Sequence, residues 1–291
     1  MVLKRVYFNI PYIDIGYTMI HNLKENLAFW NPWWEGESGM LEDLRQRGCM
    51  EAIEPLFARK EMLALTGVRR SGKTSIMLLL VRKALKGMAP ENVLYANLDD
   101  PAFGSVNIGD IVQAYEELKT PEGRRLLFLD EVQESDDWER WLKRLYDSGT
   151  DVKIVLSGSN SSLLKTEYSA YLSGRSISYD VFPLSFEEYL EFNGVVAKTE
   201  GQQLAGANKI RHMLASYMEH GGFPEAVLEP DRVLGATLLK EYYSAIIARD
   251  ILGRHGIREG RKLEMLVDAL VTNVSSPPSA KSMGSTLALN T

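Results

Sequence analysis

The chain has 291 residues, of which 45% are hydrophobic and 25% charged, and a formal net charge of −6. This composition is typical of a globular protein with one large domain or two smaller ones, and the negative charge excludes a general electrostatic attraction to nucleic acid. Cys49 is the single cysteine, which excludes an intramolecular disulfide and fits a reducing compartment, and no apolar stretch is long enough for a membrane span, so we expect a cytoplasmic protein without a membrane partner.

Residues 1–45 precede the first predicted strand and form an N-terminal extension. It contains the aromatic run Phe29-Trp30-Asn31-Pro32-Trp33-Trp34. This run is either an anchor that packs on the following domain or an exposed docking patch for a partner, and the anchor is favoured. The stretch Leu41–Phe57 then predicts a helix that leads into the first strand.

A glycine-rich loop follows the short apolar run Met62–Thr66, which predicts a buried strand. The loop has the spacing G-x-x-x-x-G-K-[ST] of a phosphate-binding loop, and the stretch Ser75–Lys86 predicts a helix after it. Glycines at its two ends allow tight backbone geometry, so that the loop N–H groups and the helix N-terminus face an anion. The residues predicted to bind nucleotide are Gly67, Val68, Arg69, Arg70, Ser71, Gly72, Lys73, Thr74 and Ser75.

Two loop side chains have specific expected roles. Lys73 supplies a positive charge to the β- and γ-phosphates, and the Thr74 hydroxyl is a magnesium ligand. A second strand over Asn92–Leu98 ends at Asp99-Asp100-Pro101. These acids either contact the metal or a nucleophile, or form an Asx turn before the proline, and the turn is favoured.

The stretch from Arg125 to Leu129 predicts a third strand, with Asp130 and Glu131 directly after it. We expect Asp130 to hold magnesium, usually through water, and Glu131 to polarise the attacking water as general base. The adjacent glutamate favours hydrolysis by the protein itself over phosphoryl transfer to a bound acceptor.

A fourth predicted strand, Val152–Leu156, ends in Ser157-Gly158-Ser159-Asn160. Ser159 or Ser157 is a candidate sensor of the γ-phosphate or the attacking water, and the same residues fit a plain strand-to-helix cap. Arg175 precedes a fifth strand that runs to about Phe182. It is either an arginine finger for a neighbouring subunit or a surface arginine favoured by a helix C-terminus.

From Ser185 onward the pattern becomes helical, and Ser185 with Glu188 predicts a capping box. We expect a loose connector over 195–207 and helices over 208–219, 233–252 and 258–273. Asn208-Lys209-Ile210-Arg211 lacks the aspartate of the guanine-recognition motif N-K-x-D, which disfavours GTP.

The motifs in this order, with Gly222-Phe223-Pro224 and the segment from Phe182 to Leu190, resemble those of bacterial and archaeal AAA+-type ATPases that carry a winged helix and a C-terminal domain of unknown function. The resemblance implies an α/β P-loop NTPase fold of the AAA+/ASCE type, with a five-stranded parallel sheet in the order 5-1-4-3-2. It implies an ATPase core over 46–184, a helical lid over 185–255 and the start of an incomplete winged helix over 256–291.

By the same resemblance, Gly222 and Pro224 match a G-x-P motif at which related signalling ATPases contact the nucleotide. Arg175 matches the arginine finger, which implies a homo-oligomer. The resemblance also implies that the chain lacks its C-terminal part, so that DNA binding is expected only when that part is present.

The expected function is therefore magnesium-dependent binding and hydrolysis of ATP to ADP and phosphate, with the nucleotide state transmitted by motion of the lid. Two alternatives stay open: a switch that holds ADP or ATP and turns over slowly, and a regulatory DNA-binding module whose reader lies in the missing part. The sequence identifies no protein client.

Overall fold

The computed structural model describes residues 15–104, 106–158, 171–253, 257 and 259–273. The chain forms two compact units. The first contains the described residues up to Gly67 together with Gly72–Val181, and the second contains Val68–Ser71 together with the described residues from Phe182 onward.

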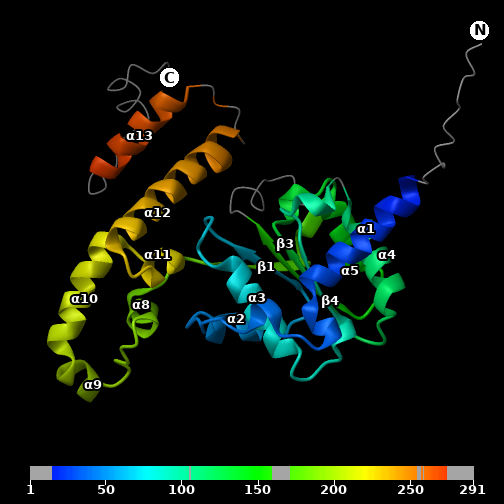
Figure 1. Cartoon of the computed structure of the whole chain (residues 1–291), viewed down its shortest axis with the longest axis horizontal. Helices are drawn as coiled ribbons and strands as arrows, with labels where there is room; N and C mark the ends of the chain where they lie inside the picture. Colours follow the sequence, from blue (N-terminus) through cyan, green and yellow to red (C-terminus); the bar gives the residue numbers. More distant parts are fainter. Residues whose placement is uncertain (1–14, 105, 159–170, 254–256, 258, 274–291) are drawn as a thin grey trace, which may run out of the picture. The chain divides into compact units, whose positions relative to one another are not determined.

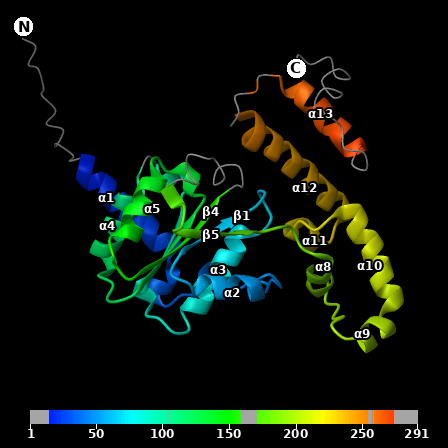
Figure 2. The same ribbon diagram turned by 180° about the vertical axis from the view of Figure 1, so that it is seen from behind.

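The first unit is built on a parallel sheet of five strands in the order β2-β3-β4-β1-β5 (Figure 1). This order confirms the expected fold, and β5 at the edge next to β1 is seen from behind in Figure 2. The central strands are apolar on both faces because helices cover both sides of the sheet. The strands are β1 (Met62–Thr66), β2 (Val93–Asn97), β3 (Arg125–Asp130), β4 (Val152–Gly158) and β5 (Ser176–Asp180).

Five α-helices surround this sheet in the described part of the first unit. Helix α3 contacts β2, β3 and β4, whereas α4 contacts both α1 and α5. Helices α4 and α5 approach closely at Gly109, where a β-carbon would lie 2.4 Å from the Trp141 ring. The apolar stripe of α5 is part of the core, since Trp138 and Leu142 are buried. The helices are α1 (Ile15–Trp30), α2 (Met50–Phe57), α3 (Lys73–Ala84), α4 (Ile108–Lys119) and α5 (Trp138–Asp147).

The N-terminal extension closes the open edge of β2. The Trp33 and Trp34 indoles donate to the Val93 carbonyl at 3.1 and 3.0 Å, and the Asn31 amide bonds both main-chain groups of Tyr95. Side chains thus satisfy the groups that a further strand would have paired, as edge strands require. The anchor interpretation of the aromatic run is confirmed for its buried tryptophans.

The turn after β2 is also confirmed. One Asp100 carboxylate oxygen accepts the Ala102 N–H at 2.9 Å, which starts the 3₁₀ turn η4 (Pro101–Phe103). Its other oxygen accepts the Trp30 indole N–H at 2.8 Å. Asp100 therefore holds this turn and the extension together.

The predicted helix over Leu41–Phe57 is wrong in its first half. A 3₁₀ turn, η2 (Gly39–Leu41), is followed by irregular chain, and α2 begins only at Met50. The Arg82 guanidinium accounts for this, because it donates to the Leu41 and Leu44 carbonyls that a helix would have used internally. Two hydrogen bonds from Arg82 have thus replaced the hydrogen bonds of a continuous helix.

The second unit is helical in its described residues and has a small core of Tyr189, Leu190, Val195 and Met213. The capping box of Ser185 and Glu188 at the start of α8 is confirmed. The helices are α8 (Phe186–Phe192), α9 (Glu200–Ala205), α10 (Ala207–His220), α11 (Pro224–Leu228), α12 (Arg232–Ala245), the π-helix η6 (Ile246–Gly253) and α13 (Gly260–Thr272).

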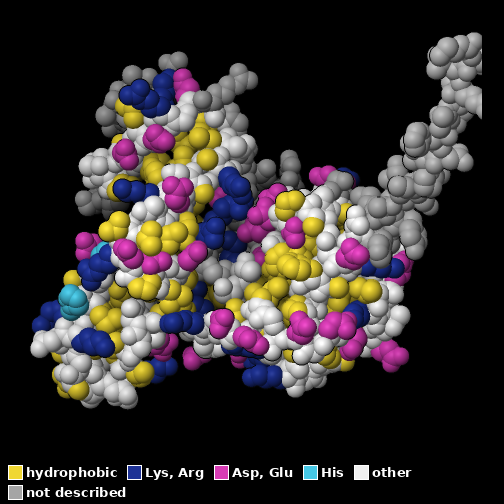
Figure 3. Space-filling model, in the orientation of Figure 1, with side chains coloured by type: hydrophobic (Ala, Val, Ile, Leu, Met, Phe, Trp, Pro, Cys, Tyr) yellow, Lys and Arg dark blue, Asp and Glu magenta, His cyan; other side chains and the backbone are white. Residues whose placement is uncertain are grey.

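Two expectations for this unit are corrected. The connector over 195–207 contains helix α9, whose capping box pairs Thr199 with Gln202. The single long helix over 233–252 changes from α to π geometry at Ile246. Hydrophobic side chains remain exposed over the helices of the second unit (Figure 3), among them Met218 of α10 and Val233 of α12.

The predicted winged helix stays a prediction. Of residues 256–291, the structure describes α13 and the few residues before and after it, and no strand is found among the described residues of the second unit. Within the same described ranges, no helix combines the length and the hydropathy that a membrane crossing requires.

Candidate functional site

The glycine-rich loop joins β1 to α3, as predicted. Gly67 and Gly72 have φ of 144° and 99°, values that side chains with a β-carbon rarely adopt. Gly72 is the residue before the first helical residue, Lys73, so the loop ends at the helix N-terminus. This arrangement directs the N–H groups of the first helical turn and the positive end of the helix dipole toward the loop.

Lys73 is buried beneath the loop. Its ammonium group donates to the carbonyl of Gly67 at 3.0 Å. The positive charge is therefore held at the loop, where the expected β- and γ-phosphates would need it.

Thr74 and Asp130 come together at the carboxyl end of β3. The Thr74 hydroxyl donates to Asp130 Oδ2 at 2.6 Å, and Asp130 is buried. A hydroxyl and a carboxylate in contact are the oxygen donors that suit Mg²⁺, which keeps several waters and takes its remaining ligands from phosphates. Among the described residues there is no cluster of three or more His, Cys, Asp or Glu that would form an all-protein cage.

Two further hydroxyl groups bind the same carboxylate. Tyr95 donates to Asp130 Oδ2 at 2.9 Å, and Ser157 donates to Asp130 Oδ1. Burial, followed by the charge of Asp130, raises the pKa of Tyr95 well above its ordinary value, so the phenol remains a donor. No local sequence pattern indicated Tyr95, because its contact with Asp130 arises from the pairing of β2 with β3, in which Asn97 lies opposite Asp130.

Glu131 directly follows Asp130 and turns the chain sharply. Its backbone is left-handed, with φ of 53° and ψ of 50°, and its N–H donates to Ser157 Oγ at 3.0 Å. Its carboxylate accepts the Gln133 side-chain amide at 2.5 Å. A left-handed glutamate is uncommon and is held by its surroundings, as is frequent at functional sites.

The Ser157 hydroxyl therefore contacts both acids: it binds the carboxylate of Asp130 and the backbone N–H of Glu131. Ser159, the other candidate sensor, lies outside the described residues. The structure thus joins Thr74, Asp130 and Ser157 by hydrogen bonds, whereas the Lys73 ammonium is bonded to the loop at Gly67. Glu131 is the next residue after Asp130.

A comparison with solved structures finds a similar fold in the Walker-type ATPase PABY2304 of Pyrococcus abyssi. The TM-score is 0.50 at 16% identity, over 86% of this chain and 87% of that chain. The fold is that of the P-loop NTPases.

Family models match two stretches of the chain, and the first of them is an AAA domain. Residues 59–190 match the AAA domain, and residues 211–291 match a domain of unknown function, DUF8612. An uncharacterized protein of Methanocaldococcus jannaschii, MJ1544, is 29% identical over 235 residues, 81% of this chain and 52% of its own length. An uncharacterized protein of Haemophilus influenzae is 31% identical over 228 residues, 77% of this chain and 54% of its own length. The chain thus spans about half the length of these relatives.

The outer turn of the P-loop, Val68–Ser71, belongs to the second unit, where acidic residues bind its two arginines. Arg69 Nε lies 3.2 Å from Asp250 Oδ1. Arg70 lies 3.4 Å from Glu225 Oε2, which also accepts the Tyr242 hydroxyl at 2.5 Å. Both arginines are therefore paired with carboxylates.

Gly222 and Pro224 of the G-x-P motif have clear packing roles. A β-carbon on Gly222 would lie 2.4 Å from the Leu184 carbonyl oxygen, and the Gly222 carbonyl accepts the Leu184 N–H at 2.7 Å. Pro224 occupies the first turn of α11, where its missing N–H is harmless. Their contact with a nucleotide stays a prediction.

Arg175 lies near the amino ends of the strands, whereas the P-loop follows the carboxyl end of β1. Arg175 precedes β5, whose first residue Ser176 pairs with Met62. Its guanidinium binds Asp147 through Nε at 2.8 Å and a terminal nitrogen at 3.1 Å, and this lowers the pKa of Asp147 to about 2. The arginine-finger role therefore stays a proposal for an assembled form.

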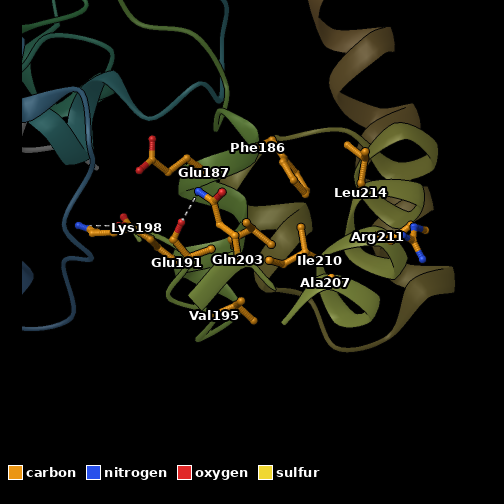
Figure 4. Close-up of a pocket in the computed structure, with 12 residues that line it drawn as sticks. Phe186, Glu187, Glu191, Val195, Lys198, Gln203, Ala207, Ile210, Arg211 and Leu214 are labelled. Carbon is orange, nitrogen blue, oxygen red and sulfur yellow. Dashed lines mark hydrogen bonds and ion pairs between the residues drawn. The ribbon is translucent and has the colours of Figure 1, made fainter. Parts of the chain in front are cut away.

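A separate pocket of about 580 Å³ lies among α8, α9 and α10 in the second unit (Figure 4). Its wall is apolar at Phe186, Leu190 and Ile210, and the Lys198–Glu191 ion pair lies at its edge. None of the predicted nucleotide or metal residues lines it.

Proposed function

We propose that this chain binds ATP together with Mg²⁺ and hydrolyses it to ADP and phosphate. The carrying observation is the 2.6 Å contact between Thr74 and Asp130, beside the Lys73 ammonium at the P-loop. A phosphate cradle, a cation and a pair of metal-binding oxygens are the parts that phosphoryl transfer requires.

The protein groups have separate tasks in this proposal. The N–H groups of Gly67–Thr74 and the Lys73 ammonium bind the β- and γ-phosphates, and Thr74 and Asp130 hold the metal ion. Magnesium, when bound, neutralises charge on these phosphates. Glu131 takes a proton from the attacking water as general base. The water oxygen forms a bond to the γ-phosphorus while the bond from that phosphorus to the bridging oxygen breaks, and ADP leaves.

Glu131→Gln is the decisive substitution. The amide is a poor base but preserves shape, so we expect ATP to bind within about twofold of wild type while turnover falls about 10²- to 10⁴-fold. Single-turnover hydrolysis and binding of ATP by calorimetry measure the two effects.

Glu134→Gln is the matched control, because Glu134 is exposed in the same short turn, η5 (Val132–Glu134). It should leave both binding and turnover unchanged. Equal turnover in wild type and Glu131→Gln would remove Glu131 from its role.

A slow nucleotide switch is the second candidate, and the bond between Glu131 and Gln133 favours it. A carboxylate engaged by a neighbouring amide is less available to water, so turnover would be limited by release of that bond. ADP that remains with the protein through purification, with negligible steady-state turnover, would support the switch.

In either case the proposed lid over 185–255 would report the nucleotide state, and Arg175 would act only across subunits.

A further inference from the structure

Three hydroxyl groups from three elements converge on the Asp130 carboxylate. Thr74 comes from the first turn of α3, Tyr95 from β2 and Ser157 from β4. Thr74 has a role in the proposed function as a metal ligand, and Ser157 also receives the N–H of Glu131. The phenol of Tyr95 is left without an assigned role.

The reach of a tyrosine side chain explains why this residue type fits the position. Asn97 is paired with Asp130 across the β2–β3 ladder, and Tyr95 lies two residues before Asn97 on the same face. Two residues of strand cover roughly 6.6 Å. A long side chain with a terminal donor is therefore needed to reach the carboxylate from position 95.

Tyr95 is also held in place from its backbone. Its N–H donates to Asn31 Oδ1 at 2.6 Å, and its carbonyl accepts the Asn31 amide at 2.8 Å. Its side chain is fully buried, and its ring centroid lies 5.7 Å from that of Trp30. The phenol oxygen therefore has little freedom to follow Asp130 if the carboxylate rotates.

We infer that Tyr95 is a positioning residue for the metal ion. By holding Oδ2 of Asp130, it keeps the carboxylate turned so that the remaining lone pair, on Oδ1, accepts a hydrogen bond from metal-bound water. The inference rests on the proposed function, since it assigns Tyr95 to the same metal site. Hydrogen-bond partners of metal-binding groups typically change metal affinity 10- to 100-fold when removed.

The test compares Tyr95→Phe with Tyr115→Phe. Tyr115 is an equally buried tyrosine of the same unit whose hydroxyl donates to the Glu91 carbonyl at 2.6 Å, so both variants lose one hydroxyl and one hydrogen bond. ATP binding is measured by calorimetry without metal and then at increasing Mg²⁺. Binding of Mn²⁺ in the presence of ADP, followed by electron paramagnetic resonance, is a second readout that does not depend on hydrolysis.

Tyr95→Phe is expected to bind metal-free ATP within twofold of wild type and to need about tenfold more Mg²⁺ or Mn²⁺ for half-saturation. Tyr115→Phe should match wild type in both measurements. Equal metal dependence in the two variants would overturn the inference, and so would a loss of metal-free ATP binding in Tyr95→Phe, because that indicates a structural role. Failure of wild type to bind ATP at any Mg²⁺ concentration would instead remove the proposed function.

Discussion

Lys153 is a buried cation at the amino end of β4. Its side chain is almost fully enclosed, and its ammonium donates to the carbonyls of Leu56 at 3.4 Å, Arg59 at 2.9 Å and Glu61. The three bonds use all three ammonium hydrogens and tie the chain between α2 and β1 to the sheet. Burial lowers the pKa of Lys153 to about 8.

Replacing Lys153 by methionine should lower the free energy of unfolding by about 1–3 kcal/mol at pH 7. Methionine fills a similar volume and removes a buried charge, but it removes the ammonium donor from three carbonyl oxygens, of which that of Leu56 also accepts the Arg59 N–H at 3.2 Å. Chemical denaturation monitored by circular dichroism measures the difference. A variant as stable as wild type would show that these bonds contribute nothing net.

The same pair of proteins provides a pH test. Between pH 8 and the ordinary lysine pKa of 10.5, the unfolded chain keeps a proton on Lys153 that the folded chain has lost. The unfolded state then binds more protons, so this group makes stability rise with pH across that window. The stability of wild type relative to Lys153→Met should therefore increase from pH 8 to about pH 9.5 and be constant below pH 7. A stability difference between the two proteins that does not change with pH would contradict the lowered pKa of Lys153.

At the scale of elements, the N-terminal extension completes the sheet with side chains in place of a strand. Asn31 is fully buried, and its side chain makes three hydrogen bonds, two of them to the backbone of Tyr95 and one to the Leu27 carbonyl. Because β2 carries Tyr95 toward Asp130, the extension also supports the candidate metal site from behind the sheet edge.

Asn31→Leu should lower the free energy of unfolding by about 2–4 kcal/mol, because the N–H and carbonyl of Tyr95 are then buried without partners. Asn22→Leu is the control, since Asn22 is exposed on α1, the helix that ends just before Asn31, and should change stability by no more than about 0.5 kcal/mol. Thermal and denaturant unfolding of both variants compare the two. A loss shared equally by the control would point to helix α1 rather than to the sheet edge.

Local patterns predicted the elements whose signals are short. The strands, the P-loop and the α8 capping box follow from residues within a few positions of one another. Tyr95 was missed because its role depends on β2 lying beside β3, which no local pattern contains. The irregular chain before α2 was missed for the same reason, since Arg82 reaches it from α3. Helix α9 carried a local signal, Thr199 with Gln202, that the glycines around it obscured.

At the scale of the whole molecule, the two units have unequal cores. Among the described residues, the buried cluster of the first unit includes most of the sheet, whereas the buried cluster of the second unit has four residues. The second unit also has several exposed hydrophobic side chains (Figure 3). Local stability follows the amount of buried apolar contact around each backbone bond.

Hydrogen exchange should therefore differ between the units. We expect the slowest amides in β1, β3 and β4, and exchange at least about 100-fold faster in α9 and α11, which are short and contain no buried residue. Mass spectrometry after timed deuterium labelling measures this. Equal protection of α9 and the central strands would show that the second unit is stabilised by more than its small core.

The bridging position of Ser157 limits what its side chain is able to sense. A serine hydroxyl has one hydrogen and two lone pairs. The hydrogen is given to Asp130, and one lone pair receives the Glu131 N–H. A single lone pair is left, which suits a solvent molecule that donates and does not suit the oxygen of a terminal phosphoryl group. Ser157 would therefore recognise the attacking water. It would bind the γ-phosphate only if its hydroxyl hydrogen were first released from Asp130.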